Sequence, residues 1–176
     1  MNPEAIEKLI DTHGNAIYNF CVYLSQSKQD AEDLYQETFL KAVEQPEKID
    51  EENNPKSYLL SVAVYIHKSR KRKFARRQQI APSVSFEEAF EMQDQYDLEN
   101  DIIKKDMQSE IRNLVSELDE QLKLPLYLYY TMDASIEEIS KIMKLPKGTV
   151  KSRLFKARKL IKKKLEVVGY EESSVV

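Results

Sequence analysis

An all-helical fold is the class that this sequence predicts, on two observations. The chain has 176 residues but only 3 glycines and 6 prolines, fewer turn residues than sheet-rich folds use. Apolar residues recur at three- and four-residue steps, which is the spacing of one helix face. Charge is also segregated along the chain. We therefore expect two small helical domains, over residues 1–78 and 102–170, joined by an acidic linker over 79–101 and followed by a flexible tail over 171–176.

Three helices are expected in the N-terminal half. The first covers 3–24, where Pro3 suits the first helical position. The second covers 27–44, opens on a sequence that resembles a capping box, and is ended by Pro46. The third covers about 57–77, apolar in its first half and basic in its second. The residues expected inward on the first helix are Ile6, Leu9, Ile10, Ile17, Cys21 and Leu24.

Residues 80–100 break this pattern, and we interpret them as a linker that can hold a short helix over 86–92. Asp119 is placed to cap one of the helices that follow, and Pro125 should kink or shorten that same helix. Regular spacing predicts four C-terminal helices, over about residues 103–118, 120–130, 135–145 and 147–168.

The net charge of −3 conceals strong segregation of acids and bases. Residues 66–79 contain seven Lys or Arg and no acid, and residues 141–164 contain eleven and no acid. Between them, residues 87–106 contain eight acids and two bases. Two basic blocks separated by an acidic one indicate two polyanion-binding surfaces on one chain. Solvated helix faces are the alternative, although such faces usually mix the two signs.

Residues 135–165 have the pattern of a helix-turn-helix. The residues expected inward are Ile136, Ile139, Ile142 and Met143 on the first helix, and Val150, Leu154, Ala157 and Ile161 on the second. One face of the second helix then packs on its partner and the other enters the major groove of DNA. The candidate DNA-binding residues are Lys147, Thr149, Lys151, Ser152, Arg153, Phe155, Lys156, Arg158 and Lys159. Lys and Ser suit base edges and Phe155 a thymine methyl, whereas Arg153 and Arg158 suit phosphates. A core position is the alternative for Phe155.

The motifs Ile136-Glu137-Glu138-Ile139-Ser140 and Leu145-Pro146-Lys147-Gly148-Thr149-Val150-Lys151-Ser152-Arg153-Leu154 resemble the fourth conserved region of extracytoplasmic-function sigma factors of bacterial RNA polymerase. In that family this helix-turn-helix reads the −35 promoter element. The resemblance implies the same role here, with Lys151, Ser152, Phe155 and Lys156 at the promoter-contacting positions. Asp119 departs from the family, which commonly has proline there.

Residues 30–42, Asp-Ala-Glu-Asp-Leu-Tyr-Gln-Glu-Thr-Phe-Leu-Lys-Ala, resemble the second conserved region of the same family. There the helix docks on the clamp helices of the largest catalytic subunit of the polymerase. The resemblance implies that Asp33, Gln36 and Glu37 bind polymerase. On the residues alone, these three share one helix face that suits a basic partner surface, and a solvated face is the alternative.

The third helix aligns with the family's −10 recognition and melting region. A basic helix interleaved with aromatic rings can hold single-stranded DNA, because charges follow the phosphates and rings stack on unpaired bases. The candidate residues are Tyr58, Tyr65, His67, Arg70, Lys71 and Lys73. The family often has Trp near position 58 and Asn at 65, so the identity of the −10 bases stays open. Core packing is the alternative for both tyrosines.

Other classes of protein lack support in the sequence. Hydrophobic residues make up 41% of the chain, and no window approaches the roughly 18–20 apolar residues of a membrane span. The N-terminus has no basic-then-apolar leader, and Cys21 is the single cysteine, so we expect a protein of the cytoplasm. His13 and His67 are the two histidines, and neither has metal-ligand spacing. We therefore expect no enzyme, cofactor, metal, small-molecule substrate or membrane insertion.

The resemblance implies a sigma factor whose partners are core RNA polymerase, promoter DNA and an anti-sigma factor. In the family the linker enters the polymerase channel, where its acids could imitate nucleic acid; a spacer extended by self-repulsion is the alternative. The competing hypothesis is a stand-alone dimeric regulator. It would explain the helix-turn-helix, but not the basic block over 66–79, the acidic segment or residues 30–42.

Overall fold

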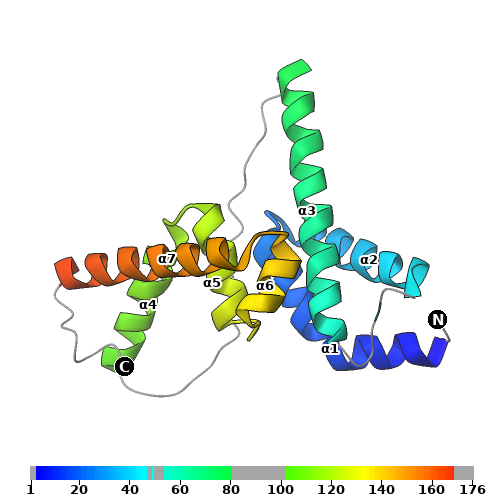
Figure 1. Cartoon of the computed structure of the whole chain (residues 1–176), viewed down its shortest axis with the longest axis horizontal. Coiled ribbons are helices and arrows are strands. Elements are labelled where there is room, and N and C mark those ends of the chain that lie inside the picture. Colours follow the sequence, from blue (N-terminus) through cyan, green and yellow to red (C-terminus); the bar gives the residue numbers. More distant parts are fainter. Residues whose placement is uncertain (1–2, 47–48, 50–53, 81–101, 169–176) are drawn as a thin grey trace. The chain divides into compact units, whose positions relative to one another are not determined.

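The computed structural model describes residues 3–46, 49, 54–80 and 102–168, and within these ranges it contains α-helices and no strands (Figure 1). The helices are α1 (Pro3–Leu24), α2 (Lys28–Glu44), α3 (Pro55–Ile80), α4 (Ile102–Ser116), α5 (Glu120–Tyr130), α6 (Ile136–Met143) and α7 (Lys147–Val168). The chain divides into two compact units, residues 1–93 and 94–176. The predicted all-helical class with a C-terminal helix-turn-helix is confirmed.

Helix α3 is longer than the predicted 57–77, since it runs from Pro55 to Ile80. Proline is tolerated in the first turn of a helix, where its missing N–H would have no partner. The side chain of Asn54 accepts a hydrogen bond from the backbone amide of Ser57 at 3.3 Å and so helps to start the helix. Residues 79 and 80 of the predicted linker therefore belong to α3. The rest of that linker, its short helix and the tail lie outside the described residues.

The bounds of α5 match the predicted 120–130, but its cap and its proline do not act as expected. Asp119 occupies the N-cap position, but its side chain makes no capping hydrogen bond. Its backbone carbonyl instead accepts the amides of Leu122 and Lys123, at 2.8 and 2.9 Å. Pro125 does not shorten α5, which continues to Tyr130. A proline just beyond the first turn removes a single backbone hydrogen bond, and here its ring is buried in the core.

In the N-terminal unit, α1, α2 and α3 all pack on one another. The core of α1 is centred on Ile17, Phe20 and Cys21, which are fully buried. Phe20 was missing from the predicted set, and Ile10, which was in it, is exposed. Gly14 of α1 leaves room for Tyr35 of α2, because a Cβ at this position would stand 2.9 Å from the Tyr35 hydroxyl.

In the C-terminal unit, α7 packs against α4, α5 and α6. The predicted inward residues of α7 are buried, except that Ile161 is half-buried. On α6 the three residues Ile139, Ile142 and Met143 are buried, whereas Ile136 is half-buried at the first turn. Leu128 of α5 is fully buried in the same core. This packing leaves the opposite face of α7 to solvent.

Candidate nucleic-acid and polymerase interfaces

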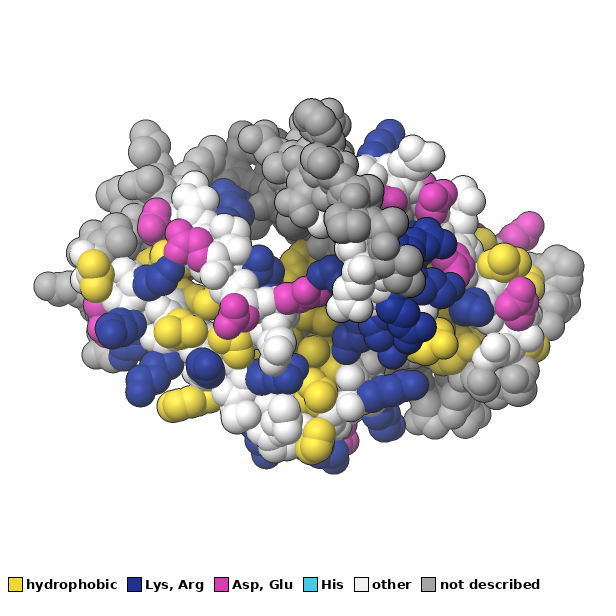
Figure 2. All heavy atoms as spheres, turned by 90° about the horizontal axis from the view of Figure 1, so that it is seen from above, with side chains coloured by type: hydrophobic (Ala, Val, Ile, Leu, Met, Phe, Trp, Pro, Cys, Tyr) yellow, Lys and Arg dark blue, Asp and Glu magenta, His cyan; other side chains and the backbone are white. Residues whose placement is uncertain are grey.

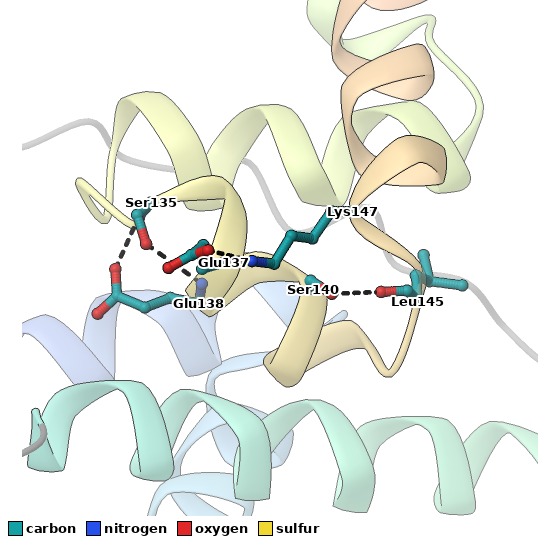
Figure 3. A network of polar contacts seen from close by, with 6 residues as sticks. All are labelled: Ser135, Glu137, Glu138, Ser140, Leu145 and Lys147. Carbon is teal, nitrogen blue, oxygen red and sulfur yellow. Dashed lines mark hydrogen bonds and ion pairs between the residues drawn. The ribbon is translucent and has the colours of Figure 1, made fainter.

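Hydrogen bonds fix both ends of the short helix α6 (Figure 3). At its start, the Ser135 hydroxyl accepts the amide of Glu138 at 3.2 Å, and the Ser135 amide donates to the Glu138 carboxylate at 2.8 Å. This is the reciprocal capping box that satisfies two helix-start donors. At its end, Lys144 adopts a left-handed φ of 55°, and the Ser140 hydroxyl donates to the Leu145 carbonyl at 2.5 Å. The turn that leads into α7 is therefore fixed by the conformation of Lys144 and by the bond between Ser140 and Leu145.

Lys147, the first residue of α7, forms an ion pair with Glu137 across this turn (Figure 3). The hydrogen bond and the charge of the Lys147 ammonium lower the pKa of the Glu137 carboxyl. Both side chains are exposed, and exposed ion pairs contribute little to stability. Lys147 could therefore leave Glu137 and bind a DNA phosphate with little loss of free energy.

The outward face of α7 carries Ser152, Phe155, Lys156 and Lys159, which recur at three- and four-residue steps and are all exposed. Phe155 is 68% exposed, which excludes the alternative that it is a core residue. Two other predicted residues lie beside this face. Lys151 is exposed, and Thr149 is half-buried. The Ser152 hydroxyl donates to the Thr149 carbonyl at 3.0 Å and keeps its acceptor capacity.

Arg153 and Arg158, by contrast, make contacts with α5. The guanidinium of Arg153 donates to the side-chain oxygen of Gln121 at 3.3 Å. That of Arg158 lies over the ring of Tyr129, 5.7 Å from its centroid, a cation–π contact. The sequence alone had suggested phosphate binding for both arginines. The structure adds a bracing role between α7 and α5.

The predicted polymerase-binding residues lie together on α2. Asp33, Gln36 and Glu37 line a shallow, open hollow together with Leu40 and Arg70. Leu40 was missed, although its side chain is 58% exposed. The available signal was its position, since it follows Gln36 and Glu37 by one helical turn and is an apolar residue on a polar face.

An ion pair connects this α2 surface to α3. The guanidinium of Arg70 donates to Oε2 of Glu37 at 2.8 Å, with side chains that are 39% and 41% exposed. The pair joins a residue predicted to bind polymerase with one predicted to bind the −10 strand. Sequence reasoning had kept these two sets apart.

The predicted −10 residues do not share one face of α3. His67 and Arg70 are half-buried and stand at helical spacing from the buried Ala63, on the side packed against the domain. Tyr65 is 52% exposed, which excludes core packing, whereas Tyr58 is half-buried. Lys71 and Lys73 are exposed, as are all residues from 71 to 77.

Lys and Arg side chains surround this exposed end of α3. Figure 2, which looks down on that end, shows them gathered around it. Phe74 is also exposed there, among the basic residues, and was not among the predicted contacts. An aromatic residue within a basic block was the signal that could have identified it.

The described ranges contain no group of three or more His, Cys, Asp or Glu side chains that could hold a metal ion. None of the helices in them is long and apolar enough to cross a membrane. Cys21 is buried, and burial raises the pKa of its thiol to about 12. At neutral pH this thiol is therefore protonated and a poor nucleophile.

Comparison with known proteins assigns each unit to a protein family. The Sigma-70 region 2 family matches residues 9–78, and the Sigma-70, region 4 family matches residues 108–161. The ECF RNA polymerase sigma factor SigW of Bacillus subtilis is 24% identical over 167 residues, which cover 92% of this chain and 89% of the relative. The ECF RNA polymerase sigma-E factor of Haemophilus influenzae is 28% identical over 145 residues, covering 80% and 77%.

The fold is also shared with a solved structure. The sigma factor RpoE of Bartonella quintana, crystallised with the anti-sigma factor NepR, superposes with a TM-score of 0.75. The two chains are 24% identical, and the match covers 93% of this chain and 98% of that one. With both sigma-70 regions present in order, the chain belongs to the sigma-70 family of promoter-recognising factors that direct transcription initiation. Within that family it is an extracytoplasmic-function (ECF) sigma factor, as its motifs predicted.

Proposed function

We propose that this ECF sigma factor recognises promoters through two separate helices. Helix α7 binds the −35 element as duplex DNA, and α3 binds the melted strand of the −10 element. The outward face of α7 is the observation that carries the proposal. Lys156 and Lys159 flank an exposed Phe155 on the second helix of a helix-turn-helix, and Val150 and Leu154 on the opposite side are buried. A recognition helix needs this division between a packed face and a basic face.

For the −35 element, we assign base contacts to Lys151, Ser152, Phe155 and Lys156. Thr149 and Lys159 border this set on the same exposed side. Lys147, Arg153 and Arg158 are assigned to phosphates, which position the helix without reading sequence. Each of these three would exchange or share an intramolecular partner on binding.

For the −10 strand, we assign the rings of Tyr58 and Tyr65 to stacking on unpaired bases. These two residues are seven apart and therefore lie on one face of α3. Lys71 and Lys73 are exposed and suit the phosphates of the strand. His67 lies at the border of the packed face. Arg70 already donates one of its N–H groups to Glu37.

For polymerase docking, we assign Asp33, Gln36 and Glu37 to the clamp helices of the largest catalytic subunit. Two carboxylates beside an amide on an exposed helix suit a basic partner surface. Asp33→Ala combined with Glu37→Ala is expected to impair binding to core polymerase. Undiminished co-purification of the double variant with the core enzyme would refute this assignment.

We also propose an anti-sigma factor as a regulatory partner, and action in the cytoplasm, where polymerase and promoters meet. Support comes from the shared fold with RpoE of Bartonella quintana, which was crystallised with the anti-sigma factor NepR. An inhibitor of this kind would have to cover the polymerase-binding or promoter-binding surfaces described above.

The direct test is co-purification of the full chain with bacterial core RNA polymerase, followed by run-off transcription on genomic fragments. We expect stoichiometric binding and new transcription start sites. A dimeric regulator would instead bind duplex DNA tightly by itself, as a symmetric dimer, and would not associate with the core enzyme. That result would overturn the proposal.

A further inference from the structure

The hollow on α2 has one lining residue that comes from another helix. Asp33, Gln36, Glu37 and Leu40 recur along α2 at three- and four-residue steps, and Arg70 reaches them from α3. The Arg70 side chain is 39% exposed, so more than half of its surface is packed in the unit, and its guanidinium is bonded to Glu37, which also lines the hollow. Its position on the packed side of α3 sets it apart from the exposed basic residues that follow it.

The ion pair uses one oxygen of the Glu37 carboxylate and leaves the other for a binding partner. Arg70 donates to Oε2, at 2.8 Å. Within the described part of the chain, Oε1 has no hydrogen bond, and Glu37 lines the hollow together with Asp33. A charge-assisted bond of this length restricts the rotamers of the carboxylate. An incoming basic side chain would therefore meet a carboxylate whose orientation is already set.

We propose that Arg70 is a positioning residue of the polymerase-docking surface, acting through Glu37, rather than a contact to the −10 strand. This inference depends on the proposed role of Glu37 in docking. Restricting a side chain before binding removes an ordering cost from association, equivalent to about 2- to 10-fold in affinity for one side chain. Arg70 also links the docking helix α2 to the DNA-binding helix α3, so that docking and strand capture use one rigid pair of helices.

The experiment measures the affinity of the full chain for purified core RNA polymerase, together with its thermal unfolding midpoint. Arg70→Ala should weaken core binding by about 3- to 10-fold, and Arg70→Lys should recover part of the loss. Arg72→Ala is the matched control, because Arg72 is exposed on the same helix and lies away from Glu37. It should bind the core enzyme as the unmodified chain does. Equal core affinity in Arg70→Ala and the unmodified chain would overturn the inference.

A charge swap tests whether the ion pair serves the fold alone, and it can be measured even if Arg70→Ala fails to fold. Glu37→Arg combined with Arg70→Glu restores an ion pair between α2 and α3. Positioning predicts that the swap recovers the unfolding midpoint and not core binding, because the wrong charge then faces the polymerase. Recovery of both would show that the pair serves the fold alone. Failure of the unmodified chain to bind the core enzyme would instead remove the docking role itself.

Discussion

Neighbouring residues on α7 offer a sharp test of the recognition face. Phe155 is 68% exposed, whereas Leu154 is 1% exposed, so the two side chains point to opposite sides of the same helix. Complete burial of a phenylalanine is worth about 1.5–3 kcal/mol, and only about a third of Phe155 is covered. Phe155→Ala should therefore lower the free energy of unfolding by about 0.5–1 kcal/mol.

The effect on promoter recognition should be larger than the effect on stability. Burying the remaining two-thirds of Phe155 against a base is worth about 1–2 kcal/mol, which corresponds to a loss of about 5- to 30-fold in affinity for the preferred −35 sequence. Leu154→Ala is the matched control, because it removes a buried side chain and should cost about 2–5 kcal/mol of stability. For a unit of this size, that loss would lower the midpoint of thermal unfolding by roughly 10 °C or more.

The assay compares holoenzymes made with each variant on the preferred promoter and on one with a mutated −35 element. Unfolding of each full chain is followed in parallel by circular dichroism. Phe155→Ala should lose discrimination between the two promoters while its unfolding midpoint stays close to that of the unmodified chain. Unchanged discrimination would refute the recognition role of Phe155. A melting loss as large as that of Leu154→Ala would refute the assignment of its side chain to the surface.

Three further outcomes are expected. Lys151→Ala and Lys156→Ala should each weaken −35 recognition by about 1–3 kcal/mol without affecting core polymerase binding, and an unchanged promoter preference in both would contradict this. Ser135→Ala should cost about 1 kcal/mol in denaturant unfolding, because it removes the cap of α6. Burial, and secondarily the charge of Lys56, lower the pKa of His13 below 6.5. As pH falls through 6.5 the unfolded chain then binds more protons, so stability should decrease, and His13→Asn should flatten this dependence.

Much of the fold could be predicted from local sequence because helix starts and ends depend on nearby residues. The predicted bounds of α1 and α5 match the structure, and Ser27 and Ser135 cap α2 and α6 as expected. Packing between helices that are far apart in the sequence was harder to predict. Periodicity suggested Ile10 as an inward residue and left out Phe20, because it does not say where along a helix the neighbouring helices end.

The candidate sites show the same division. Residue types and spacing predicted the outward face of α7, and the resemblance of residues 30–42 to the family predicted the docking residues of α2. Leu40 and Phe74 were missed although each had a signal in the sequence, and their exposure in the folded unit is what shows that they are not core residues. Exposure also decided between alternatives for Phe155 and Tyr65, which sequence alone had left open.

By itself, the sequence determined the helical class and, through the resemblance of its motifs, the order of the two sigma regions. The helical class follows from periodicity and capping, which are local properties of the chain, and residue types and motifs predicted the contact residues. Only the tertiary structure decided which of these residues already have partners. Arg70 and Glu37 are 33 positions apart and form an ion pair, and Arg153 reaches Gln121 over 32. Such pairs depend on how helices cross, which is set by the packing of whole faces and not by any short stretch of sequence.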